Sequence, residues 1–162
     1  MNTSRYWKFA APLVVIGLLL VAGCSDNSKL PRNSQTVDGM TIELGVLPAE
    51  LIQGHVTAPG EPNALHGGTP PNSRSHHIVV ALFDAKTGAR ITDARIRAGV
   101  GNRSYNHDPD TLLEPMEVNG TISYGNFFLL QGEGVWRIHL EIARAGAPRP
   151  VEADFAYERP AD

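Results

Sequence analysis

Apolar and polar residues alternate strictly along several short stretches of this 162-residue chain. The clearest stretch is 136–142, whose apolar members are Trp136, Ile138, Leu140 and Ile142. Successive side chains of a β-strand point to opposite faces, so this period indicates strands with one buried face. The same alternation at 40–46 and 151–157 predicts that sheet structure dominates the chain.

Turn signals separate these stretches, and Asn119-Gly120 is a strong signal for a hairpin. The expected strands cover 40–46, 77–83, 91–100, 116–118, 121–130, 136–142 and 151–157, with a weaker one at 51–56. We expect 77–83 and 91–100 to form a hairpin. About seven strands, with no convincing helix after the N-terminal segment, predict an all-β fold. The expected architecture is a single antiparallel β-sandwich, immunoglobulin-like or cupredoxin-like.

The N-terminus has the pattern of an export signal. Arg5 and Lys8 precede an apolar run at 9–22, which at about 14 residues is too short to cross a membrane. Small residues then lead to Cys24 and resemble a lipobox, which predicts cleavage before Cys24 and a lipid on its thiol. The alternative is an ordinary signal peptide with an incidental cysteine.

The expected organisation is a cleaved lipoprotein signal peptide at 1–23, a lipidated cysteine with a flexible polar tether at 24–36, and the β-sandwich domain at 37–160. The lipid would anchor the protein to the membrane without spanning it. Ser25 follows the cysteine, and the resemblance to lipoproteins implies an outer-membrane location facing the periplasm in a Gram-negative host.

Composition excludes several kinds of function. Cys24 is the only cysteine, so one chain can form neither a disulfide nor a cysteine-based metal site. Removing the signal removes two positive charges, so the formal charge becomes 12 minus 17, or −5. No basic run suits nucleic acid, and no catalytic motif is present, so we do not expect an enzyme.

The six histidines are the best candidate ligands, and they are His55, His66, His76, His77, His107 and His139. His66 lies in a Gly- and Pro-rich loop at 57–75, a length typical of functional or mobile loops. We expect the neighbours His76 and His77 to point to opposite faces of their strand. His107 is interpreted as part of a solvated loop, and His139 as a surface residue.

Imidazole and thioether donors together suit copper, especially Cu(I). We therefore regard His77 and Met116 as the first candidate ligands, with His66 and His76 next. The alternatives are a polar pair at the start of a strand for the two adjacent histidines, and core packing for Met116. Gly125, between aromatic residues, indicates a bulge or a close backbone approach.

Three segments resemble the periplasmic, iron-transport-associated P19/Tp34-type proteins: Glu114-Pro-Met116, Tyr124-Gly-Asn126, and the strand from Gly134 to Leu140. The start of the strand at Ser75-His-His-Ile78 resembles that family's first metal-ligand strand. The resemblance covers roughly 77–155 and implies an immunoglobulin-like sandwich that binds copper or another transition metal through His, Met and a carboxylate.

Two positions depart from that family. Ser123 stands where the family has a histidine, and Val79 stands where it has a carboxylate, so His77 and Met116 are the residues that match. The C-terminal part is also similar to the YtkA/FixH-like exported domains, which implies a link to copper and oxidase assembly.

The leading hypothesis is a lipid-anchored envelope β-sandwich that binds or delivers a transition metal, copper above all, without catalysis. The alternative is a metal-free scaffold that contacts another envelope protein through the 57–75 loop and the edge strands.

Overall fold

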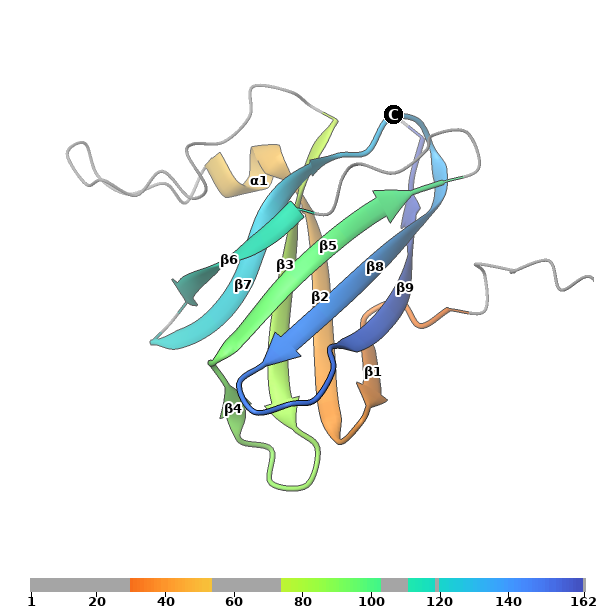
Figure 1. Cartoon of the computed structure of the whole chain (residues 1–162). Coiled ribbons are helices and arrows are strands. Elements are labelled where there is room, and N and C mark those ends of the chain that lie inside the picture. Colours follow the sequence, from red (N-terminus) through yellow and green to blue (C-terminus); the bar gives the residue numbers. More distant parts are fainter. Residues whose placement is uncertain (1–29, 54–73, 103–110, 119, 162) are drawn as a thin grey trace, which may run out of the picture.

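The protein is described by a computed structural model covering residues 30–53, 74–102, 111–118 and 120–161 (Figure 1). Strands dominate this part of the chain, which confirms the predicted all-β fold. The elements are β1 (Ser34–Val37), β2 (Met40–Pro48), α1 (Ala49–Gln53), β3 (Ser75–Asp84), β4 (Arg90–Ile91), β5 (Ala94–Gly101), β6 (Thr111–Val118), β7 (Thr121–Leu129), β8 (Gly134–Arg144) and β9 (Val151–Arg159).

The strands follow the order β1-β2-β3-β7-β6-β5-β8-β9, with β4 paired to β3. The β6 strand joins the two halves, because its first residues pair with β5 and its last with β7. On the other side the sheet curls until β1 approaches β9 (Figure 1). There the backbone N–H of Ala156 donates to the carbonyl of Pro31 at 2.9 Å. The result is a flattened sheet that nearly closes into a barrel.

The core lies between the two halves of this sheet. One half contributes alternate apolar residues of β2 and β3, and the other contributes those of β5, β8 and β9. The residues with no exposed surface include Ile42, Ile78, Val80, Leu82, Ile96, Ile138, Leu140 and Phe155. Burial of each large apolar side chain contributes about 1.5–3 kcal/mol, so the period-two pattern is also the main source of stability.

Three expectations from the sequence differ from the structure. The prediction of a weak strand at 51–56 was wrong for residues 51–53, which belong to α1. Pro48 ends β2, and the good helix formers that follow it begin the helix. The tether expected to reach residue 36 becomes β1 at Ser34, because Asp38 and Gly39, with φ of 48° and 75°, turn the chain into a hairpin with β2.

The third difference concerns the hairpin expected between 77–83 and 91–100. Only the two residues of β4 return along β3, while β5 pairs with β8 and β6 in the opposite half. The phenolic hydroxyl of Tyr124 accepts a hydrogen bond from the backbone N–H of Ala94 at 3.0 Å, which fixes the point where the chain changes sides.

No helix in the described ranges is long and apolar enough to cross a membrane. The expected signal peptide, Cys24, His55, His66, His107 and residues 57–73 of the loop expected at 57–75 lie outside the described residues.

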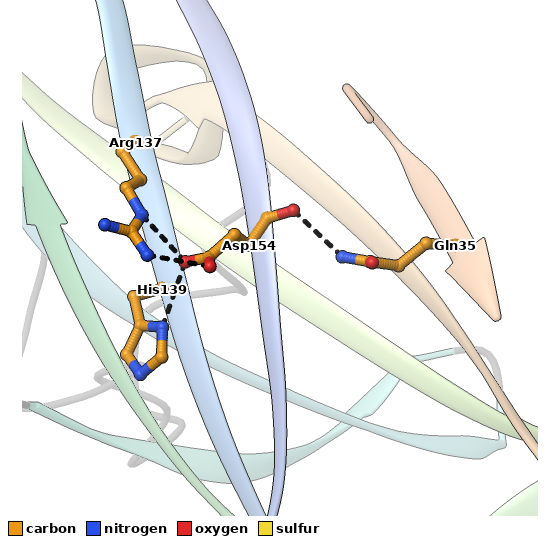
Figure 2. A network of polar contacts seen from close by, with 4 residues as sticks. All are labelled: Gln35, Arg137, His139 and Asp154. Carbon is orange, nitrogen blue, oxygen red and sulfur yellow. Dashed lines mark hydrogen bonds and ion pairs between the residues drawn. The ribbon is translucent and has the colours of Figure 1, made fainter. Parts of the chain in front are cut away.

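A polar network on the outer surface links β8, β9 and β1 (Figure 2). The Asp154 carboxylate accepts hydrogen bonds from Arg137 Nε and Nη2, at 2.8 and 2.7 Å, and from His139 Nδ1 at 3.0 Å. Its backbone carbonyl accepts from Gln35 Nε2 at 2.9 Å. Partial burial raises the pKa of Asp154, but the hydrogen bonds from Arg137 and His139 outweigh it, and the pKa lies below its usual value.

We expect Asp154→Asn to lower the free energy of unfolding at neutral pH by about 1 kcal/mol, the scale of a partly exposed ion pair. Because the folded-state pKa is lowered, this stabilisation is present above the ordinary value of 3.8 and is lost as pH falls through the lowered value. Urea unfolding of both proteins along a pH series measures the difference. Arg144→Gln, which removes the exposed 3.4 Å ion pair with Asp93, is the control; equal losses at every pH in the two variants would contradict the prediction.

Candidate metal centre

Two of the candidate ligands, His77 and Met116, lie on the outer face of β3, β7 and β6, the face turned away from the core. In register, Gly125 of β7 pairs with Val79 of β3 on one side and with Glu114 of β6 on the other. Directly paired residues share a face, and residues two apart on one strand do too. We call this surface the β3–β7–β6 outer face. It carries His77, Val79, Ser123, Gly125, Glu114 and Met116.

His77 is held in place by a glycine and an aromatic ring. Its side chain is 1% exposed. A Cβ built on Gly125 would lie 2.9 Å from His77 Nε2 and 3.0 Å from its Cε1, so the imidazole occupies the space that a side chain at 125 would fill. The Phe127 ring packs beside it, with centroids 4.8 Å apart. The register continues through Gly125, so this residue marks a close approach rather than a bulge.

The imidazole therefore extends from β3 across β7, in the direction of β6. Glu114 is directly opposite Gly125, and Met116 is opposite Ser123, two residues further along β7. Diagonal neighbours on adjacent strands are about 7–8 Å apart, which long side chains can span. The fold thus places His77 and Met116, 39 positions apart in sequence, on one face, and Met116 is a diagonal neighbour of the Gly125 position that the imidazole covers.

His76 is on the opposite side of β3, as the alternation predicts. It is 4% exposed, and its ring meets Tyr157 edge-on at a centroid distance of 5.7 Å. Its Nδ1 lies 3.1 Å from the carbonyl oxygen of Arg74. The structure therefore separates His76 from His77 and from Met116. His139 is also apart, in the network of Figure 2.

Two residues of the outer face were not among the sequence candidates. Glu114 was detectable, because it lies two positions before Met116 on one strand and must share its face. Gly125 lies between Val79 on β3 and Glu114 on β6, so Glu114 provides a carboxylate on the far side of Gly125 from Val79. Val79 stands at the position where the resembling family has its carboxylate. Within the described ranges, no group of three or more His, Cys, Asp or Glu side chains gathers.

The second residue is Arg90, which no sequence signal connects to this face. Its Nε donates to the carbonyl of Ile122 at 2.9 Å, and its Nη2 donates to Ser123 Oγ at 2.7 Å. The guanidinium also lies 4.7 Å from the centroid of the Phe83 ring. A fixed positive charge therefore covers Ser123, the position at which the resembling family has a histidine.

No family model and no curated protein matches the chain. Solved structures do match. A copper-reconstituted P19 protein from Campylobacter jejuni has a TM-score of 0.61 at 14% identity, covering 80% of this chain and 95% of that one. A copper-bound variant of FetP from uropathogenic Escherichia coli has a TM-score of 0.58 at 13% identity, over 80% and 96%. A DUF4426 family protein from Pseudomonas aeruginosa also has a TM-score of 0.58, at 16% identity over 80% and 95%.

The shared feature is the fold. At these identities the likeness places the chain among sandwich domains of this architecture, several of which were solved with copper.

We expect Gly125→Ala to destabilise the protein by about 1–3 kcal/mol, because the new methyl group would overlap the imidazole of His77. The same substitution should cost less in a His77→Ala background, although the Ile78 carbonyl, 3.0 Å from the built Cβ, retains part of the cost. A double-mutant cycle from chemical denaturation measures this coupling.

The matched control is Gly45→Ala on β2, where a Cβ meets nothing within 4 Å. Equal costs of Gly125→Ala with and without the imidazole would show that the glycine is not required for the placement of His77.

Proposed function

We propose that this protein is an exported, lipid-anchored β-sandwich that binds copper on the β3–β7–β6 outer face and holds or delivers it without catalysis. The observation that supports this most directly is the position of the His77 imidazole over Gly125, on the same face as Met116 and Glu114. A small residue at 125 leaves the room that the imidazole needs, and the fold supplies a thioether and a carboxylate from the adjacent strand.

The donor types support copper over harder ions. A thioether is a soft ligand that selects Cu(I), imidazole binds copper in both oxidation states, and a carboxylate alone would favour Mg²⁺, Ca²⁺ or Mn²⁺. His77 and Met116 are the proposed primary ligands. Glu114 is the proposed third donor. It would replace the carboxylate that the resembling family has at the position of Val79. His66, outside the described residues, stays a candidate from the sequence alone.

The copper-bound P19 and FetP structures add support, because they share the fold and their copper is part of what was solved. The proposed location is the cell envelope, with the lipid on Cys24 in the membrane and the domain facing the periplasm. It rests on the charged start, the short apolar run and the small residues before Cys24.

The copper proposal is tested by titrating the mature chain with Cu(I) in competition with a chromophoric chelator such as bicinchoninate. We expect one bound ion per chain. In His77→Ala/Met116→Ala the affinity should fall by more than roughly tenfold, since even loss of a supporting residue at a metal site costs that much.

The control is His139→Ala, which removes a histidine from the opposite half of the sheet and should leave the affinity unchanged. Circular dichroism establishes that each variant is folded. Cu(I) bound equally tightly by the double variant and by wild type would rule out this site. No Cu(I) bound by wild type would favour the metal-free scaffold.

The anchoring proposal has its own test. We expect Cys24→Ser to move the protein from the membrane fraction to the soluble fraction of the host envelope, because the lipid has no other thiol to occupy. Mass spectrometry of the N-terminal peptide of wild type should show a diacylglycerol mass on Cys24. Unchanged membrane association of the serine variant would contradict the proposal.

A further inference from the structure

The guanidinium of Arg90 is held on the β3–β7–β6 outer face by three contacts. It donates to the Ile122 carbonyl and to Ser123 Oγ, and it stacks over the Phe83 ring. A long cationic side chain on a surface ordinarily keeps its charged head in water. Here its charge is fixed at one position, which the pairing of β4 with β3 determines.

That position is next to the proposed ligands. Ser123 and Gly125 are two residues apart on one strand, a separation of roughly 6.5 Å on the same face. Arg90 covers the first and the His77 imidazole covers the second. Met116 pairs directly with Ser123, so the Cβ atoms of these two residues are about 5 Å apart. An ion held by His77 and Met116 would therefore lie within roughly 10 Å of the guanidinium.

We infer that Arg90 is a specificity-determining residue that makes this face select a singly charged soft cation, Cu(I), over divalent ions such as Cu²⁺, Zn²⁺ and Ni²⁺. This rests on the proposed function. Coulomb repulsion scales with the charge of the ion, so a fixed positive charge disfavours a divalent ion twice as strongly as a monovalent one.

The charges of the groups around the proposed ion also disfavour a divalent ion. The His77 and Met116 donors are neutral when they bind a metal, and Glu114 contributes one negative charge. The charge of Arg90 offsets that of Glu114, so these two groups together leave no negative charge to compensate a second positive charge on the ion. At about 8 Å and an effective dielectric constant of about 20–40, the extra charge of a divalent ion corresponds to roughly a fivefold to thirtyfold loss of affinity.

A purely structural role for Arg90, as a link between β4 and β7, makes a different prediction. It would change stability and the affinities for all ions together, without changing their ratio. The neutral variants are Arg90→Gln, which retains hydrogen-bonding capacity, and Arg90→Leu, whose apolar side chain can lie on Phe83 without adding a metal donor. Arg90→Lys keeps the charge. The matched control is Arg95→Gln on β5, which removes the same charge from the opposite half of the sheet.

The experiment measures dissociation constants of Cu(I), under anaerobic reducing conditions, and of Ni²⁺ and Zn²⁺ for the mature wild type and each variant. Chemical denaturation of the same samples establishes which variants are folded. We expect either neutral variant at position 90 to raise divalent affinity relative to Cu(I) by about fivefold or more, with a smaller effect at high salt. Arg90→Lys and Arg95→Gln should keep the wild-type ratio.

A folded neutral variant with the wild-type ratio would overturn the inference while leaving copper binding intact. An equal change in ratio for Arg95→Gln would also overturn it, because the effect would then come from net charge alone. Failure of wild type to bind Cu(I) would instead refute the proposed function, and the inference with it.

Discussion

The β6 strand determines how the two halves of this protein are connected. Its residues 111–113 pair with β5, and its residues 114–118 pair with β7. At the change of partner, Leu113 is buried in the core at 2% exposure, while the next residue, Glu114, is on the outer face. A shift of one residue in this register would bury the carboxylate and expose the leucine, so the core itself fixes which side chains of β6 accompany His77.

The sequence predicts the strands of this fold well wherever one face is buried. The alternation in β2, β8 and β9 reports the core directly, and the same argument correctly places His76 and His77 on opposite sides of β3. The sequence was less informative about the strand and helix boundaries that depend on turns and prolines. The turn at Asp38-Gly39 creates β1 in a segment whose composition suggested a tether, and α1 begins where Pro48 ends the ladder.

The candidate site was predictable only in part, for a physical reason. His77 and Met116 carry recognisable donor chemistry, and Glu114 follows from the period of its strand. Arg90 reaches Ser123 only because β4 folds back along β3 beside the start of β7, a consequence of register between distant segments. Residue type and local spacing contain no information about such a contact. Gly125 was predictable in part. The sequence indicated a close approach at this glycine, but not that the imidazole of His77 makes it.

The contacts of Pro31 and Arg32 have a geometric consequence for an anchored protein. The carbonyl of Pro31 accepts from Ala156 on β9, and Arg32 forms a 3.0 Å ion pair with Glu158. If Cys24 carries the proposed lipid, six residues separate it from Pro31, a reach of about 25 Å when fully extended. The side of the barrel where β1 meets β9 would then lie within that reach of the bilayer, and the β3–β7–β6 outer face lies across the sheet order from it.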